Sequence, residues 1–261
     1  MARTGDMENR HRHILEILSN DAAASVTRLA DSLHVSKETI RKDLQILASA
    51  GKITRIHGGA ALIEGSDNMP FRIRKTFAED EKRHVAKAAG TLIEKDDTLI
   101  IEGGTVNVML CNYLLEHKEK TETLTIITNS LRIAQMLGYG KRCRKFFLLG
   151  GQLDAEEGRA TGSLTISMLD SLHADKTFIS AAALDKQLQI TAYKENDMRF
   201  QKKAIQCADK TYVLINKSKY PSTALFTVCK VSELTGIVTD IAFDHKVLEQ
   251  LNKGQVEVVQ A

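Results

Sequence analysis

The segment from Ser25 to Leu62 constrains the fold of this chain more than any other: SVTRLADSLHVSKETIRKDLQILASAGKITRIHGGAAL. It predicts a helix, a tight turn, a second helix rich in Lys and Arg, and then a short hairpin. This is the order of a winged helix-turn-helix, which places the second helix of the pair in the major groove of DNA. The segment therefore indicates the kind of partner before the rest of the chain is considered.

Apolar residues at helical spacing predict three helices in this unit, the first over residues 10–18. Ser25 and Ser36 are expected as the N-caps of the next two helices, because a serine hydroxyl can accept a hydrogen bond from the first helical turn. Gly51 is well placed to end the third helix. The buried face of that helix is expected to hold Ile40, Leu44 and Leu47.

The candidate DNA contacts lie on the polar face of the third helix and on the hairpin. Lys and Arg can bond guanine or grip phosphate, and Thr can contact a base edge or a thymine methyl. The first residues of a recognition helix are those that reach base edges, and a basic wing lies near backbone phosphates. We expect the contacts to come from Ser36, Lys37, Glu38, Thr39, Arg41, Lys42, Lys52, Arg55 and His57.

A solvated basic helix in an ordinary helical bundle is the alternative interpretation, and a run of charges alone would favour it. Here the charges occur together with caps, a turn of suitable length and a trailing hairpin, which favour DNA binding. Individual residues keep an alternative role, since Arg41 or Lys42 could instead pair with Asp43 or Glu38.

The composition limits the remaining options. The formal net charge of the 261 residues is only +3, so DNA contacts must come from local placement of charge. The apolar runs are too short for a signal peptide or a membrane span, so we expect a cytoplasmic protein. The four cysteines are far apart and form no C-x-x-C pair, which favours reduced thiols over a zinc site or disulfide framework. We expect no cofactor and no metal.

The domain organisation follows from a change in pattern after the hairpin. Residues 1–62 are expected to form the DNA-binding domain, and the polar, turn-rich residues 63–75 a linker. Residues 76–261 are expected to form a second domain. Residues 71–94 are expected to form a charged amphipathic helix, which starts in the linker and continues into this domain.

Short apolar strands alternate with helices in this second domain, which indicates an α/β fold with a largely parallel sheet. The expected strands span residues 98–101, 124–128, 145–149, 176–182, 212–215, 236–239 and 256–259.

Ligands of open parallel sheets bind at the carboxyl ends of the strands, where this chain has several small or hydrogen-bonding residues. Glycine lets a ligand approach the backbone, the start of the next helix offers N–H groups to an anion, and a lysine can pair with a phosphate. For each of these strand ends taken singly, an ordinary turn without a ligand is the alternative interpretation. The candidate effector-binding residues are Glu102, Gly103, Gly104, Thr105, Thr128, Asn129, Gly150, Gly151 and Lys219.

These residues resemble the DeoR-type family of bacterial sugar-operon repressors over nearly the whole chain. The most specific match is V-S-x-x-T-I-R-x-D-L from Val35 to Leu44, followed by Gly-Gly-Ala in the wing. Further matches are Glu81-Lys82, Thr128-Asn129, Gly150-Gly151 and Ser218-Lys219. The resemblance implies a sensor domain similar in fold to ribose-5-phosphate isomerase and CoA-transferase enzymes. It also implies a phosphorylated sugar intermediate as effector and oligomeric binding to operator DNA.

Three segments depart from that family's pattern. Glu102 stands where an Asp opens the usual Asp-x-Gly-Thr-Thr loop, and Val106 replaces its last Thr. Ala181 to Ala183 replace a glycine-rich strand end, and Asn216 replaces the Asp of the usual Asp-x-Ser-Lys. We interpret these changes as a sign of an altered ligand or a weakened site.

The leading hypothesis is a transcriptional repressor of a carbohydrate-metabolism operon that acts as a homodimer or homotetramer. An alternative is a sugar-phosphate isomerase with a DNA-binding appendage, in which Glu102 would be the base and Lys219 the cation for the oxyanion. A third interpretation treats the second domain as an oligomerisation platform only, which the alanines at residues 181–183 would allow.

Overall fold

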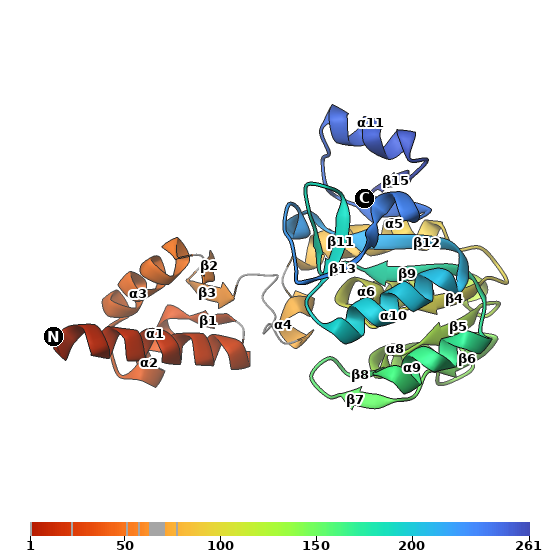
Figure 1. Ribbon diagram of the computed structural model, residues 1–261. Helices are drawn as coiled ribbons and strands as arrows, with labels where there is room; N and C mark the ends of the chain where they lie inside the picture. The colour runs from red at the N-terminus through yellow and green to blue at the C-terminus, as the bar shows by residue number, and fades with distance from the viewer. Residues whose placement is uncertain (1, 22, 51, 57, 63–70, 77) are drawn as a thin grey trace. The chain divides into compact units, whose positions relative to one another are not determined.

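The computed structural model describes residues 2–21, 23–50, 52–56, 58–62, 71–76 and 78–261. The chain forms two compact units, Met1–Phe77 and Ala78–Ala261, and Figure 1 labels most of their elements. Residues 63–70 of the predicted linker lie outside the described residues. Its last five residues, 71–75, belong to a short helix that ends at Thr76.

The first unit contains three main helices and a small antiparallel sheet. Its elements are α1 (Ala2–Asp21), β1 (Ala23–Ser25), α2 (Val26–Leu33), α3 (Lys37–Ser49), β2 (Ile53–Ile56), β3 (Gly59–Leu62) and α4 (Phe71–Thr76). The strand order is β1-β3-β2, so the predicted hairpin gains a third strand just before α2. The winged helix-turn-helix is thus confirmed, and α1 is longer than predicted because it continues beyond both ends of the apolar pattern.

Local chemistry explains the boundaries of the two central helices. The Ser25 hydroxyl accepts a hydrogen bond from the Arg28 amide at 3.1 Å, and Ser36 accepts one from the Thr39 amide at the same distance. Between the helices, His34 adopts a left-handed conformation with φ 51°, which closes the turn. Helix α3 ends at Ser49, and the predicted stop at Gly51 lies outside the described residues.

A seven-stranded parallel sheet organises the second unit. Its order is β15-β14-β12-β9-β4-β5-β6, and every pairing within it is parallel, as predicted. The strands are β4 (Thr98–Ile101), β5 (Thr125–Thr128), β6 (Lys145–Leu148), β9 (Ala174–Ser180), β12 (Ala208–Ile215), β14 (Gly236–Thr239) and β15 (Glu257–Gln260).

Helices cover both faces of this sheet. They are α5 (Glu79–Thr91), α6 (Thr105–Glu116), α7 (Lys118–Thr121), α8 (Leu131–Leu137), α9 (Ser163–Met168), α10 (Glu195–Gln206) and α11 (His245–Lys253). In β4, Ile100 packs in a cluster with Phe200 of α10, and its neighbours Leu99 and Ile101 point to the opposite face. All three strand residues are fully buried, as expected for a parallel strand covered on both sides.

The structure corrects the single helix predicted over residues 71–94. Helix α4 ends at Thr76 and α5 begins at Glu79. Ala78, which precedes α5, has a left-handed backbone with φ 48°, so the helical path cannot be continuous there.

Several short elements of the second unit were not predicted from the sequence. Strands β7 (Gln152–Asp154) and β8 (Arg159–Thr161) form a hairpin, and β10 (Ala183–Leu184), β11 (Gln189–Ala192) and β13 (Phe226–Lys230) form a separate antiparallel sheet. Short 3-10 helices span Leu169–Ser171, Lys217–Lys219 and Val231–Glu233. Strands β7, β8 and β10 contain only two or three residues each, too few to show an alternating pattern.

In the described part of the chain, no helix is both long and apolar enough to cross a membrane. The four cysteines are free thiols.

Candidate DNA interface and effector site

Helix α3 presents a polar face opposite its buried residues. Lys37, Glu38, Arg41 and Lys42 are exposed on it, together with Lys52 and Arg55 of the wing segment. Thr39 is half-buried, and its hydroxyl lies 2.9 Å from that of Ser36. The structure therefore gathers eight of the nine predicted DNA contacts on one helix and its wing, and His57 lies outside the described residues.

The wing contacts the recognition helix directly. Arg55 Nη1 of β2 donates a hydrogen bond to the Arg41 carbonyl at 3.3 Å, so two predicted contacts from different elements are neighbours. Arg41 Nη1 also lies 3.3 Å from Glu38 Oε2, in an ion pair whose two side chains are more than half exposed. Such exposed pairs are weak, so Arg41 can leave Glu38 for a phosphate at little cost.

Asp43 has a different partner from the two considered in the sequence analysis. Its carboxylate is buried and accepts hydrogen bonds from Arg10 Nε at 2.5 Å and from Arg10 Nη2 at 3.0 Å. His11 Nε2 lies 3.0 Å from the same carboxylate. Sequence reasoning missed Arg10 and His11, although an acid on the buried stripe of a helix signals a need for a cationic partner.

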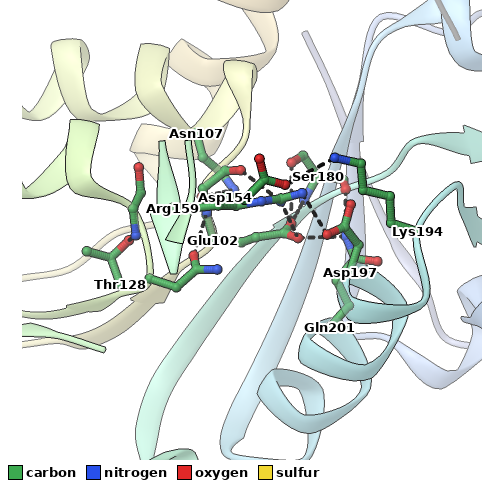
Figure 2. A network of polar contacts seen from close by, with 12 residues as sticks. Glu102, Asn107, Thr128, Asp154, Arg159, Ser180, Lys194, Asp197 and Gln201 are labelled. Carbon is green, nitrogen blue, oxygen red and sulfur yellow. Dashed lines mark hydrogen bonds and ion pairs between the residues drawn. The ribbon is translucent and has the colours of Figure 1, made fainter. Parts of the chain in front are cut away.

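The sensor-side candidates centre on Glu102, which follows β4 at the carboxyl edge of the sheet. Its buried carboxylate accepts hydrogen bonds from the Ser180 amide and from Gln201 Nε2, both at 2.8 Å. Arg159 Nη1 lies 3.9 Å from Glu102 Oε1. Figure 2 shows these groups converging from four segments that are distant in the sequence.

Arg159 ties the hairpin to helix α10 and to the loop after β4. Its Nη2 donates to Asp197 Oδ1 at 2.6 Å, and its Nη1 donates to the Gly103 carbonyl at 3.2 Å. On the same hairpin, Asp154 accepts from Lys194 Nζ at 3.1 Å (Figure 2). Sequence reasoning missed Arg159, Ser180, Asp197 and Gln201, because their proximity to Glu102 depends on the strand order.

The charges of this network shift its titration. Burial raises the pKa of Glu102 to about 7, although Arg159 and the Ser180 amide oppose the rise. Burial lowers the pKa of Arg159, but Asp197 and Glu102 outweigh it and hold the pKa above its ordinary value. Glu102 is therefore a carboxyl group that changes charge near neutral pH while Arg159 stays cationic.

Two of the predicted loop clusters meet each other. Asn129 Oδ1 accepts a hydrogen bond from the Gly103 amide at 3.0 Å, and Asn129 Nδ2 donates to the Ala160 carbonyl at 3.0 Å. The Thr128 hydroxyl donates to the Ile101 carbonyl at 2.6 Å. These side chains hold the ends of β4, β5 and β8 together. Gly104 and the buried Thr105 begin α6 beside them.

The other predicted clusters lie along the same edge. The Gly150 carbonyl accepts a hydrogen bond from the Thr165 hydroxyl at 2.8 Å, and Gly151 adopts φ 146°. Lys219 follows β12, which β9 separates from β4 in the sheet. Near Lys219, Asn216 Nδ2 donates to the Ser218 hydroxyl at 2.8 Å. Lys219 thus lies at a different strand end from Glu102. The contacts of the Glu102 carboxylate described above come from Ser180 of β9, Gln201 of α10 and Arg159 of β8.

Comparisons with known proteins assign both units. Residues 10–66 match the DeoR-like helix-turn-helix domain, and residues 78–241 match the DeoR C terminal sensor domain. The chain is 31% identical over 255 residues to the lactose phosphotransferase system repressor of Streptococcus mutans, covering 94% of this chain and 96% of that protein. It is 27% identical over 249 residues to the glycerol-3-phosphate regulon repressor of Escherichia coli, with coverages of 95% and 97%.

Among solved structures, ribose 5-phosphate isomerase A from Methanocaldococcus jannaschii matches with a TM-score of 0.40 and 18% identity over 54% of each chain. A winged helix-turn-helix joined to a parallel α/β unit defines a DNA-binding regulator with a ligand-sensing domain. The chain belongs to the DeoR family of transcriptional repressors. It is accordingly a regulator and not an isomerase.

Proposed function

We propose that this protein represses an operon for carbohydrate metabolism and is controlled by a phosphorylated sugar or a related metabolite bound to its second unit. The observation that carries the DNA-binding role is the exposed cationic face of α3, which Arg55 of the wing extends through its contact with Arg41. The names of the Streptococcus and Escherichia relatives, which refer to lactose phosphotransferase and glycerol 3-phosphate, support the class of regulated genes and of effector.

The DNA contacts can be tested with a duplex carrying the promoter next to the gene for this chain. Arg41→Ala should weaken binding in a gel-shift titration and flatten the salt dependence by about one unit of slope if Arg41 contacts a phosphate. Lys246→Ala, an exposed lysine on α11, is the matched control and should leave both quantities unchanged. Unchanged affinity and slope for Arg41→Ala would remove this residue from the interface.

The effector site is proposed at the carboxyl edge of β4, β5 and β6, where the predicted residues surround the Glu102 network. The supporting features are the close approach of Gly103 to Asn129 and the buried Arg159, a side chain suited to anions. A ligand that binds one arrangement of the oligomer better than another would shift the population between DNA-competent and incompetent states. We propose a homodimer or homotetramer as the assembly that does so.

A thermal-shift panel tests this site. Ribose 5-phosphate, glucose 6-phosphate, fructose 1-phosphate and glycerol 3-phosphate are compared with the same compounds without phosphate. A ligand bound only by the native state raises the melting temperature, and a phosphorylated compound should do so where its parent does not. Arg159→Gln should remove that shift. Silence across the panel would instead favour a second unit that serves only as an oligomerisation platform.

A further inference from the structure

Helix α3 contains two acidic side chains with opposite surroundings. Asp43 is buried against the first helix, whereas the Glu38 side chain is 66% exposed. Glu38 lies in the first turn of α3, on the side opposite the buried Ile40 and Leu47. All residues of α3 are described, and the other charged side chains on its exposed face are the cations Lys37, Arg41 and Lys42. Glu38 is therefore a single negative charge at the start of a cationic face.

A carboxylate in this position has few partners on a DNA duplex. It only accepts hydrogen bonds, and it is repelled by the phosphate groups that a lysine or an arginine binds. The donors on base edges in the major groove are the N4 amino group of cytosine and the N6 amino group of adenine. Adenine N6 lies between two acceptors, its own N7 and the O4 of the paired thymine, whereas cytosine N4 has an acceptor on one side only, the guanine O6. Cytosine is therefore the base whose edge suits a glutamate best.

Arg41 holds the Glu38 carboxylate from the next turn of the helix. Its Nη1 lies 3.3 Å from Glu38 Oε2, and this contact does not use the second carboxylate oxygen, Oε1. Arg55 of the wing donates to the Arg41 carbonyl at 3.3 Å and so supports this turn of the backbone. A guanidinium group has five N–H donors, so Arg41 can keep Glu38 and bind a phosphate at the same time. Arg41 thus restricts the orientation of the carboxylate and offsets its repulsion from the DNA backbone.

We propose that Glu38 recognises a cytosine of the operator by accepting a hydrogen bond from the N4 amino group, and that Arg41 positions its carboxylate. The proposal rests on the DNA-binding role in the proposed function, because α3 must enter the major groove, and it adds the base that one residue selects. The cations of α3 attract every duplex alike. Glu38 supplies the rejection of other sequences, since a site without the cytosine leaves its carboxylate desolvated and unpaired beside phosphates.

Selection of bound duplexes from a random library by the full chain tests the base assignment. The wild type should select a motif with cytosine at one position, and replacement of that C·G pair by T·A should weaken binding by about tenfold or more. Glu38→Gln should prefer adenine at the same position, because a glutamine amide bonds the adenine N6 and N7 together. The matched control is Glu119→Gln, which removes the charge of an exposed glutamate on α7 and should select the wild-type motif.

Gel-shift titrations with the selected duplex and with a shuffled duplex separate base recognition from a structural role. Glu38→Gln should bind the shuffled duplex more tightly than the wild type by about twofold or more, because a negative charge near the phosphates is removed. The same variant should lose the preference for cytosine over thymine. Arg41→Ala should reduce this preference as well as the overall affinity, and the loss of a phosphate contact alone would not do so. Urea unfolding checks that each variant folds.

The outcomes distinguish the base assignment from the DNA-binding role on which it rests. If the wild type selects no motif, sequence-specific DNA binding and the base assignment are both wrong. If the wild type selects a motif and Glu38→Gln selects the same one, Glu38 serves only the start of the helix and its pair with Arg41. The base assignment is then overturned while DNA binding stands. A cytosine preference that Arg41→Ala leaves intact would show that Arg41 does not position the carboxylate.

Discussion

Arg10 and Asp43 join the first helix of the protein to its recognition helix, with Arg10 Nε 2.5 Å from Asp43 Oδ2. The two residues are 33 positions apart, and the carboxylate is buried on the inner side of α3. Lys42, the neighbour of Asp43 in α3, is exposed, so this contact holds the helix that carries the candidate DNA contacts. His11 reinforces it from the same helix.

We therefore expect Asp43→Ala to destabilise the first unit by about 2–3 kcal/mol, because Arg10 loses its partner in a mostly buried position. Urea unfolding of the full chain measures the change. Glu38→Ala, which breaks the exposed pair with Arg41, should cost no more than about 0.5 kcal/mol. Equal effects of the two substitutions would show that the buried pair has no special role.

The wing should contribute to DNA affinity through Arg55. Because Arg55 is exposed and lies against the Arg41 carbonyl, Arg55→Ala should leave stability unchanged and remove one phosphate contact. The expected result is weaker binding and a salt slope reduced by about one unit. Fluorescence anisotropy with promoter DNA at several salt concentrations measures both, and Lys202→Ala on α10 is the control. A variant that retains the wild-type slope would place Arg55 away from phosphate.

Glu102 should make stability depend on pH near neutrality. Its pKa is raised to about 7 in the folded protein from an ordinary value of 4.5, so the folded state binds more protons than the unfolded state between these values. Stability is therefore highest below the unfolded pKa and falls as pH rises through about 7.

Glu102→Gln removes this titration. The unfolding free energy of the variant minus that of the wild type should therefore be larger at pH 8 than at pH 5, by about 1–3 kcal/mol. Denaturant unfolding at both pH values provides the comparison. The exposed Glu119→Gln should leave the pH profile unchanged. Parallel profiles for the wild type and Glu102→Gln would contradict the raised pKa.

Two adjacent glycines in the candidate effector site should respond differently to alanine. A Cβ on Gly151 would lie 2.0 Å from the Thr165 hydroxyl and 2.9 Å from the Thr161 carbonyl oxygen, and φ 146° disfavours any side chain. A Cβ on Gly150 would meet no atom within 4 Å. Gly151→Ala should lower the unfolding free energy by about 2–3 kcal/mol, and Gly150→Ala by no more than about 0.5 kcal/mol. Thermal unfolding distinguishes them, and a neutral Gly151→Ala would show that the loop can rearrange.

The sequence alone predicted the local elements well where chemistry acts over a few residues. Ser25 and Ser36 cap the helices they precede, and the seven strands of the parallel sheet lie close to the predicted segments. The break between α4 and α5 was missed because no proline or glycine marks it; the signal is only the backbone conformation of Ala78. The hairpin β7–β8 was missed because its strands contain three residues each.

What the sequence determined by itself is the class of each unit, since caps, periodicity and a recognition motif depend on neighbouring residues. The tertiary structure decided which distant residues meet: Arg10 with Asp43, Arg159 with Asp197, and Gln201 with Glu102. These contacts depend on helix packing and on the strand order, in which β9 lies between β4 and β12. Burial then changes the charge of Glu102, an effect that requires the surrounding fold and is invisible in the order of the residues.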